Sequence, residues 1–167
     1  MKVVYNTCHG GFGLSPLALT EFSKRKGDTI FWYEQVNREY DTPDRYVRLD
    51  TIPEASDSLY VVALSANCGK EFEEFTFKEP RHTYRTYKND EKSFRTDLDL
   101  VAVVEELGDK ANDRFSELDI AEIPDGAVYE IDEYDGYESV VPPRMTWEQA
   151  MEMNSETPES TASTPRA

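Results

Sequence analysis

A strand, a glycine-rich loop and a helix follow one another at the start of the sequence, and this order constrains the fold more than any other feature. The strand is the run Val3-Val4-Tyr5, whose residues favour extended backbone. Three glycines follow at positions 10, 11 and 13, and glycine allows the positive φ angles of a tight turn. Ser15 suits the N-cap of a helix and Pro16 its first position. We expect this helix to span about residues 16–26 and to pack on the strand.

The loop between strand and helix has the geometry of a phosphate site, because backbone N–H groups at a helix N-terminus bind anions. A nucleotide or other phosphate ligand would then contact Gly10, Gly11, Gly13 and Ser15. The sequence completes neither the P-loop pattern, which needs a Lys followed by Ser or Thr, nor the dinucleotide-binding pattern. The alternative is a tight turn that only lets the helix pack on the strand.

Cys8 and His9 are the only candidates for catalysis that the loop offers. A thiolate near a helix N-terminus has a lowered pKa, and a histidine could act as its base. Neighbours on a strand, however, point to opposite faces, and a small buried cysteine is the alternative. The sequence therefore assigns no catalytic residue and no cofactor, and it leaves open whether the protein is an enzyme.

The negative charge of the chain is concentrated in its second half. The net charge is −16, and residues 96–167 hold 19 Asp and Glu against four Lys and Arg, whereas residues 1–95 hold 15 against 14. Such a field repels nucleic acid and attracts a basic protein surface. The acids expected to contact a partner are Glu130, Asp132, Glu133, Asp135 and Glu138. The alternative is that the acidic residues only keep the protein soluble.

The sequence patterns for nucleic-acid binding, metal binding, membrane insertion and export are weaker or absent. Residues 81–95 interleave basic residues with tyrosines, which suits single-stranded nucleic acid, but an exposed strand or loop is the alternative. The acids around Gly136 lack EF-hand spacing, and Cys8 and Cys68 lack metal-ligand spacing, so we expect no metal and reduced thiols. No apolar run is long enough to span a membrane, and no secretory signal is evident.

The remaining elements follow from hydrophobic periodicity. Leu100, Val103, Val104 and Leu107 recur at helical spacing, and Thr96 with Asp99 has the spacing of a capping box. A further short helix is expected from Thr146. Strands are expected at about 29–33, 46–49, 59–64, 75–77, 118–123, 128–132 and 137–141, the last three as an antiparallel meander.

These elements predict an α+β fold in a single domain over residues 1–152. Its sheet is expected to be mixed, and the first strand, the first helix and residues 29–33 could form a right-handed βαβ unit. The tail, residues 153–167, consists of Ser, Thr, Pro and Glu without an aliphatic run and is expected to be disordered.

Two parts of the sequence resemble a known family. The first is Val3-Val4-Tyr5-Asn6, then Cys8, then the loop from Gly10 to Ser15. The second comprises Leu100 to Gly108, Ala111-Asn112, Ile123 to Gly126, Glu130 to Gly136, and Arg144 with Trp147. This pattern is similar to that of small proteins carried by tailed bacteriophages and prophages. The resemblance covers residues 1–35 and 95–147; the middle, residues 36–94, and the tail differ.

The resemblance implies a phage-encoded protein that works in the cytoplasm of the bacterial host, but it implies no particular activity. Together with the charge distribution, it leads us to expect an accessory protein whose acidic half binds a host protein, for example in defence or nucleic-acid handling. The alternative is a small-molecule protein or small enzyme that uses the loop at residues 8–15. The sequence does not indicate an oligomeric state.

Overall fold

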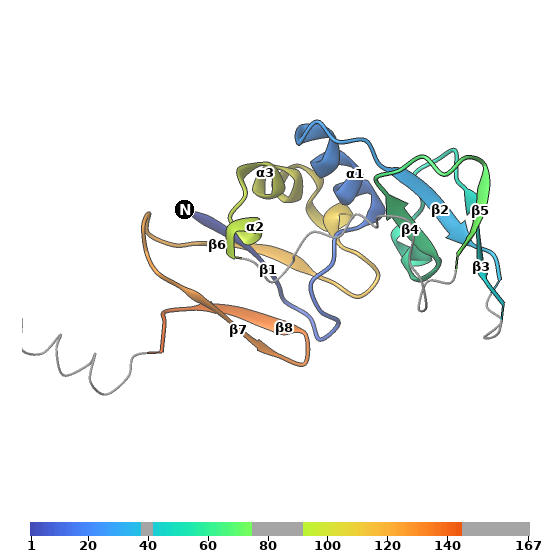
Figure 1. The fold of residues 1–167 in the computed structure, drawn as a ribbon. Helices are drawn as coiled ribbons and strands as arrows, with labels where there is room; N and C mark the ends of the chain where they lie inside the picture. Colours follow the sequence, from blue (N-terminus) through green and yellow to red (C-terminus); the bar gives the residue numbers. More distant parts are fainter. Residues whose placement is uncertain (38–41, 75–91, 145–167) are drawn as a thin grey trace, which may run out of the picture.

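The computed structural model of the chain describes residues 1–37, 42–74 and 92–144 (Figure 1). Within these ranges the α-helices are α1 (Pro16–Arg25), α2 (Lys92–Arg95) and α3 (Leu98–Leu107), with short 3-10 helices η1 (Ala55–Tyr60) and η2 (Gly108–Ala111). The strands are β1 (Lys2–Asn6), β2 (Phe31–Gln35), β3 (Asp44–Arg48), β4 (Val61–Leu64), β5 (Glu71–Glu74), β6 (Leu118–Glu122), β7 (Glu130–Tyr134) and β8 (Tyr137–Val141). The α+β class is confirmed. The strand expected at 75–77, the helix expected from Thr146 and the tail lie outside the described residues.

The strands form three separate sheets, and every described pair is antiparallel. One sheet pairs β1 with β6, the second has the order β4-β2-β3-β5, and the third is the hairpin β7-β8. The expected mixed sheet is therefore wrong. The expected βαβ unit is wrong as well, because β1 and β2 belong to different sheets on either side of α1 (Figure 1).

The expected meander of the last three strands is also corrected. β6 pairs with β1, with Val4 opposite Ile120, and leaves β7 to pair with β8 alone. In the chain between the two sheets Tyr129 is buried, and its hydroxyl donates to the Lys92 carbonyl oxygen of α2 at 3.2 Å.

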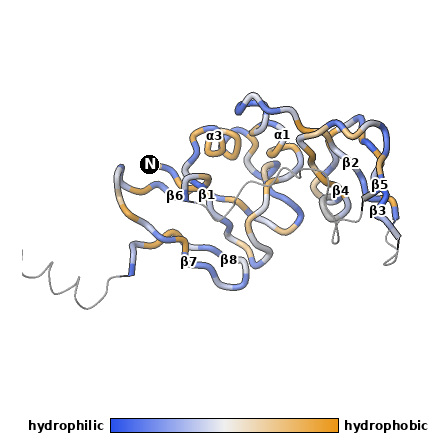
Figure 2. The backbone as a smooth tube through the Cα atoms, viewed as in Figure 1, coloured by the Kyte–Doolittle hydropathy of each residue, from blue (hydrophilic) through white to orange (hydrophobic). Residues whose placement is uncertain are grey.

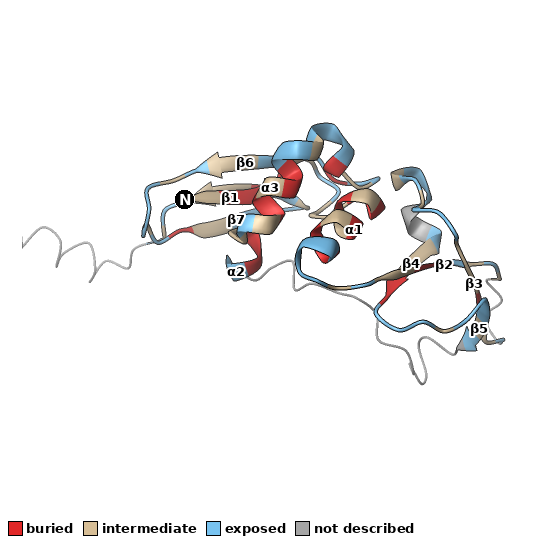
Figure 3. Cartoon of the chain, turned by 90° about the horizontal axis from the view of Figure 1, so that it is seen from above, coloured by how far each residue is buried: buried red, intermediate tan, exposed pale blue. Residues whose placement is uncertain are grey.

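The larger core lies where α1, α2 and α3 meet β1. Figure 2 shows the hydrophobic stretch along α3, and Figure 3 shows buried residues gathered on α1 and α3. The central buried residues of this core are Val4, Ala18, Phe22, Phe94, Leu100, Val101, Val103, Val104 and Ala111. The helices cover one side of β1, and β8 lies against β1 from the other side (Figure 1).

A second, smaller core lies in the four-stranded sheet. Its buried residues are Tyr33, Tyr46 and Leu64. Phe72 on β5 stacks on Tyr46 with ring centroids 4.9 Å apart and meets Tyr33 edge-on at 5.1 Å. Trp32 joins this sheet to the helices, because its indole N–H donates to the Thr20 hydroxyl on α1 at 3.0 Å.

Candidate functional site

The glycine loop after β1 is enclosed by two other segments of the chain. A Cβ atom at Gly10 would lie 1.8 Å from the carbonyl oxygen of Phe115, so the loop packs directly on that backbone. A Cβ atom at Gly136, in the turn between β7 and β8, would lie 2.5 Å from the amide nitrogen of Gly11. Gly11 itself has a φ of +92°, which only glycine adopts readily. These close approaches and the positive φ explain why glycine occupies these positions without requiring a bound ligand.

The N-terminus of α1 is satisfied by the protein itself. The Ser15 hydroxyl accepts from the Ala18 amide at 3.1 Å and donates to the Lys110 carbonyl oxygen at 2.6 Å. The carboxylate of Asp113 lies beside Gly13, within 3.3 Å of where a Cβ atom would sit, and its Oδ1 is buried without a hydrogen-bond partner in the part of the chain that is described. A phosphate here would meet a carboxylate, so the described contacts favour the packing interpretation of the loop.

Cys8 and His9 are not brought together as a nucleophile and base. The thiol of Cys8 is half-buried and donates to the Phe115 carbonyl oxygen at 3.2 Å. His9 is exposed, and its ring centroid lies 5.6 Å from that of Tyr137. Among the described residues no hydrogen bond joins the two side chains, so the geometry does not favour catalysis at this position.

Asn6, which sequence reasoning did not single out, connects the loop to both neighbouring segments. Its side chain is fully buried. The amide nitrogen Nδ2 donates to the carbonyl oxygens of Cys8 and Gly136, each at 2.6 Å, and Oδ1 accepts from the Glu117 amide at 2.8 Å. The sequence signal that could have identified Asn6 is its position as a polar residue at the end of an apolar strand. A side-chain amide that is buried in such a position must find hydrogen-bond partners.

A buried ion pair lies next to Asn6. The guanidinium of Arg95 on α2 makes two hydrogen bonds to Glu138 on β8, Nη2 to Oε1 at 2.7 Å and Nη1 to Oε2 at 3.0 Å. The same Oε2 accepts from the Asn6 backbone amide at 2.8 Å, and the guanidinium lies 3.4 Å from the centroid of the Phe12 ring. The Arg95 and Glu138 side chains are 3% and 7% exposed. This network holds the hairpin on β1.

The burial of Glu138 removes it from the acidic surface on which we placed it. Side chains alternate between the two faces of a hairpin, and cross-strand partners share a face. Glu138 pairs with Glu133 and is followed on the same face by the Val140–Ile131 pair, so this face turns toward the domain. Arg95 offsets the desolvation cost of the buried Glu138 carboxylate, because its guanidinium supplies a positive charge and two hydrogen bonds.

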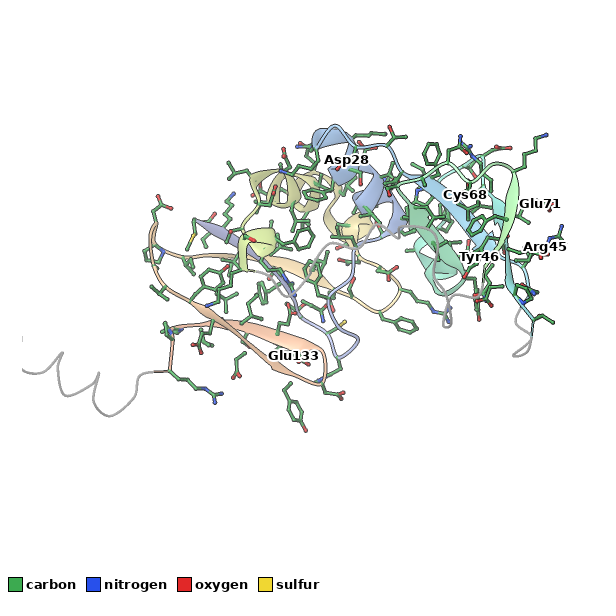
Figure 4. The ribbon with its side chains drawn as sticks, viewed as in Figure 1. Asp28, Arg45, Tyr46, Cys68, Glu71 and Glu133 are labelled. Atoms are coloured by element: carbon green, nitrogen blue, oxygen red, sulfur yellow. The ribbon has the colours of Figure 1, made fainter. Side chains whose placement is uncertain are left out.

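The other predicted acids are less buried than Glu138, although Glu133 shares its face of the hairpin. Asp132, Glu133 and Asp135 are exposed and Glu130 is half-buried (Figure 4 labels Glu133). Asp132 lies 3.1 Å from the guanidinium of Arg144. Within the described ranges, Glu130, Glu133 and Asp135 have no cation at ion-pair distance. We call Glu130, Asp132, Glu133, Asp135 and the 80% exposed Tyr134 the acidic hairpin surface.

Six of the described acids elsewhere in the second half are paired with cations of the first half. The pairs are Lys2 with Glu105 and Glu122, Arg25 with Glu106, Lys26 with Asp97 and Asp99, and the terminal amine with Asp125. The hydrogen bond to Glu105 raises the pKa of Lys2, and the terminal amine lowers the pKa of Asp125. The fold thus gives every acid of α3 a cation. On the hairpin, by contrast, Asp132 is paired with Arg144, and among the described residues Glu133 accepts only from the Gly136 amide at 2.6 Å.

Two cations of the basic, tyrosine-containing segment contact other parts of the chain; Lys92 is exposed and Arg95 is buried. The Lys92 ammonium donates to the Tyr129 carbonyl oxygen at 2.6 Å, and Arg95 is paired with Glu138. Residues 75–91, with the tyrosines of that segment, lie outside the described residues. The two described cations are therefore occupied and support no nucleic-acid interface.

In the described ranges no cluster of three or more His, Cys, Asp or Glu side chains is arranged to hold a metal ion. No helix of the described chain has the length and apolar composition needed to cross a bilayer. No family model matches the sequence, and neither the curated proteins nor the solved structures contain a significant match.

Proposed function

We propose that the protein acts by binding a basic surface of another protein through the acidic hairpin surface. In this proposal the protein is a phage-encoded accessory protein, as the resemblance implies, and its partner is a protein of the host cytoplasm. The observation that supports this proposal is the division of the acids into two sets. The acids of α3 have cations from β1, α1 and its C-cap, whereas Glu130, Glu133 and Asp135 on the hairpin have none among the described residues.

Unpaired carboxylates close together repel one another, and a basic partner relieves that repulsion. The hairpin adds Tyr134, whose large ring is almost fully exposed beside these charges. Tyrosine is enriched at interface centres because it buries a large area at small entropic cost. Protein interfaces commonly have aromatic residues at the centre and polar or charged residues at the rim, and the acidic hairpin surface has both kinds of residue. The net charge of −16 would also speed the encounter with a basic partner.

A pull-down from bacterial lysate at low salt tests the proposal. The bait is the tagged full chain, and the variant replaces Glu130, Asp132, Glu133 and Asp135 with lysine. The matched control makes the same charge change on four exposed acids elsewhere, namely Asp50, Glu54, Asp109 and Glu117. Circular dichroism establishes that both variants fold.

We expect a basic host protein that binds the wild type and the control variant but not the hairpin variant. Binding should weaken steeply from low to physiological salt, because the Debye length falls to about 8 Å. Equal capture by the hairpin variant would refute the proposal. If mass spectrometry instead finds a heat-released nucleotide and no protein, the glycine loop becomes the better candidate.

A further inference from the structure

The hairpin has one unpaired edge, which is a feature separate from its charge. β7 pairs only with β8 in the described part of the chain, and β8 is the strand that lies against β1. The other edge of β7 is therefore the outer boundary of this sheet. An exposed strand edge presents unpaired N–H and C=O groups to any strand that fits.

The register identifies which backbone groups face outward. Tyr134 and Tyr137 flank a two-residue turn, Asp135-Gly136, in which both φ angles are positive, at 50° and 83°. In such a turn the flanking residues form a hydrogen-bonded pair, and hydrogen-bonded and non-bonded pairs then alternate along the strands. Ile131 and Glu133 fall at the non-bonded positions. Their N–H and C=O groups therefore point away from β8, toward the open edge.

The composition of β7 determines which strand the edge accepts. Natural proteins often protect an edge with lysine or proline, and Glu130–Tyr134 contains neither. A second copy of this strand would place acids opposite acids, and like charges directly opposite destabilise a pair. A strand with lysine or arginine at alternate positions would instead place cations beside Glu130 and Asp132 and over the ring of Tyr134.

We propose that the outer edge of β7 receives an extended, lysine- or arginine-bearing segment of the partner protein as a third strand. This inference rests on the proposed function and specifies how the partner binds. Backbone hydrogen bonds to Ile131 and Glu133 supply the register, and the alternate cations supply selectivity. β7 is five residues long, the usual length of such an added strand.

The test uses two synthetic peptides with the full-length protein. The first has about nine residues, a typical strand length, and alternates lysine with valine. The second has the same sequence but carries N-methyl groups on the valines, which keeps its charges and blocks one hydrogen-bonding edge. Isothermal titration at low salt gives the affinities, and NMR hydrogen exchange follows individual amides of β7.

We expect the unmodified peptide to bind at least about tenfold more tightly than the methylated one. The amides of Ile131 and Glu133 should become protected, whereas those of Asp132 and Tyr134, already bonded to β8, should not change. Glu133→Pro removes one outward N–H and should weaken binding more than Glu133→Gln, which removes the same charge.

Equal binding of the two peptides without new protection would overturn strand addition and leave charge-based docking standing. Failure of both peptides to bind at low salt would contradict both proposals. Protection of Ile131 and Glu133 in the free protein would show that the chain's own residues already cover the edge, which also overturns strand addition.

Discussion

At the scale of single residues, the contacts around Asn6 decide how the loop, the hairpin and the segment after α3 fit together. Asn6 has no exposed surface, and each of its side-chain polar atoms has a partner in a different segment. Next to it, Arg95 and Glu138 form an ion pair that is strong only while both members are present. Sequence patterns locate strands and helices, but they do not show that an arginine at 95 will meet a glutamate at 138.

Arg95→Met tests the buried ion pair. It leaves the Glu138 carboxylate buried and without its cation, which should lower the free energy of unfolding by about 3 kcal/mol in urea denaturation. The double variant Arg95→Met/Glu138→Leu should cost less than the sum of the two single changes, because it removes both charges together. Strictly additive costs would show that the pair is not coupled.

Gly10→Ala and Gly11→Ala compare two neighbouring positions of the loop. At Gly10 a methyl group would overlap the Phe115 backbone, so we expect a loss of at least about 2 kcal/mol and a clearly lower melting temperature. At Gly11 the space is open and only the positive φ is unfavourable, which costs about 1 kcal/mol. A similar, small effect at both positions would indicate an open loop rather than a packed one.

At the scale of elements, the helices agree with the sequence more closely than the sheets do. α1 begins after Ser15, whose hydroxyl caps it, as the sequence predicts. α3 spans Leu98–Leu107, which contains the predicted helical repeat, and ends at Gly108 with a φ of 53°; its N-cap is Asp97 and not Thr96. The Asp97 carboxylate accepts from the amides of Asp99 and Leu100, so the helix is capped one residue later than the capping box we expected.

Asp97 links stability to pH. Burial alone would raise its pKa, but the hydrogen bonds from Lys26 and from the backbone amides lower it below the ordinary value of 3.8. A carboxyl with a lowered folded pKa stabilises the protein above its unfolded pKa and loses that contribution as the pH falls through the folded value. Asp97→Asn, which keeps a good N-cap, should therefore destabilise by about 0.5 kcal/mol at neutral pH.

Unfolding measured from pH 7 down to about pH 2, below the ordinary pKa of Asp, checks this expectation. The difference between wild type and Asp97→Asn should shrink toward the acidic end of the range. Asp97→Ala also removes the cap, which costs about 1 kcal/mol more. A difference between wild type and Asp97→Asn that is constant with pH would exclude a role for the charge.

At the scale of the whole molecule, two cores of unequal size share one chain. The larger core joins three helices to β1, whereas the smaller one has three buried residues in the part of the chain that is described, Tyr33, Tyr46 and Leu64. The hydrogen bond from Trp32 to Thr20 connects them through α1. Ion pairs between the two halves of the chain lie at the surface around the larger core.

Hydrogen exchange should separate the two cores. A core with few buried apolar residues opens at lower free energy, so we expect the amides of β2 and β3 to exchange at least about tenfold faster than those of β1 and α3. Thr20→Val removes the acceptor of the Trp32 indole and should increase this difference. Uniform exchange rates across both cores would show that the chain opens as one cooperative unit.

The sequence by itself determined the elements governed by neighbours along the chain. These are the strand, loop and helix at the start, the helix before Gly108, the Asp135-Gly136 turn and the excess of acids in the second half. Periodicity and capping act over a few residues, so they can be interpreted locally.

Only the tertiary structure decided which strands pair, which acids meet cations and which side of the hairpin is buried. A strand can pair with any compatible edge, and the pairing of β1 with β6 joins segments more than 100 residues apart in the sequence. Glu138 belongs to the same acidic run as Glu133, and only a cation 43 residues away places it in the interior. Long-range contacts of this kind carry no local signature, because their energy depends on the whole fold.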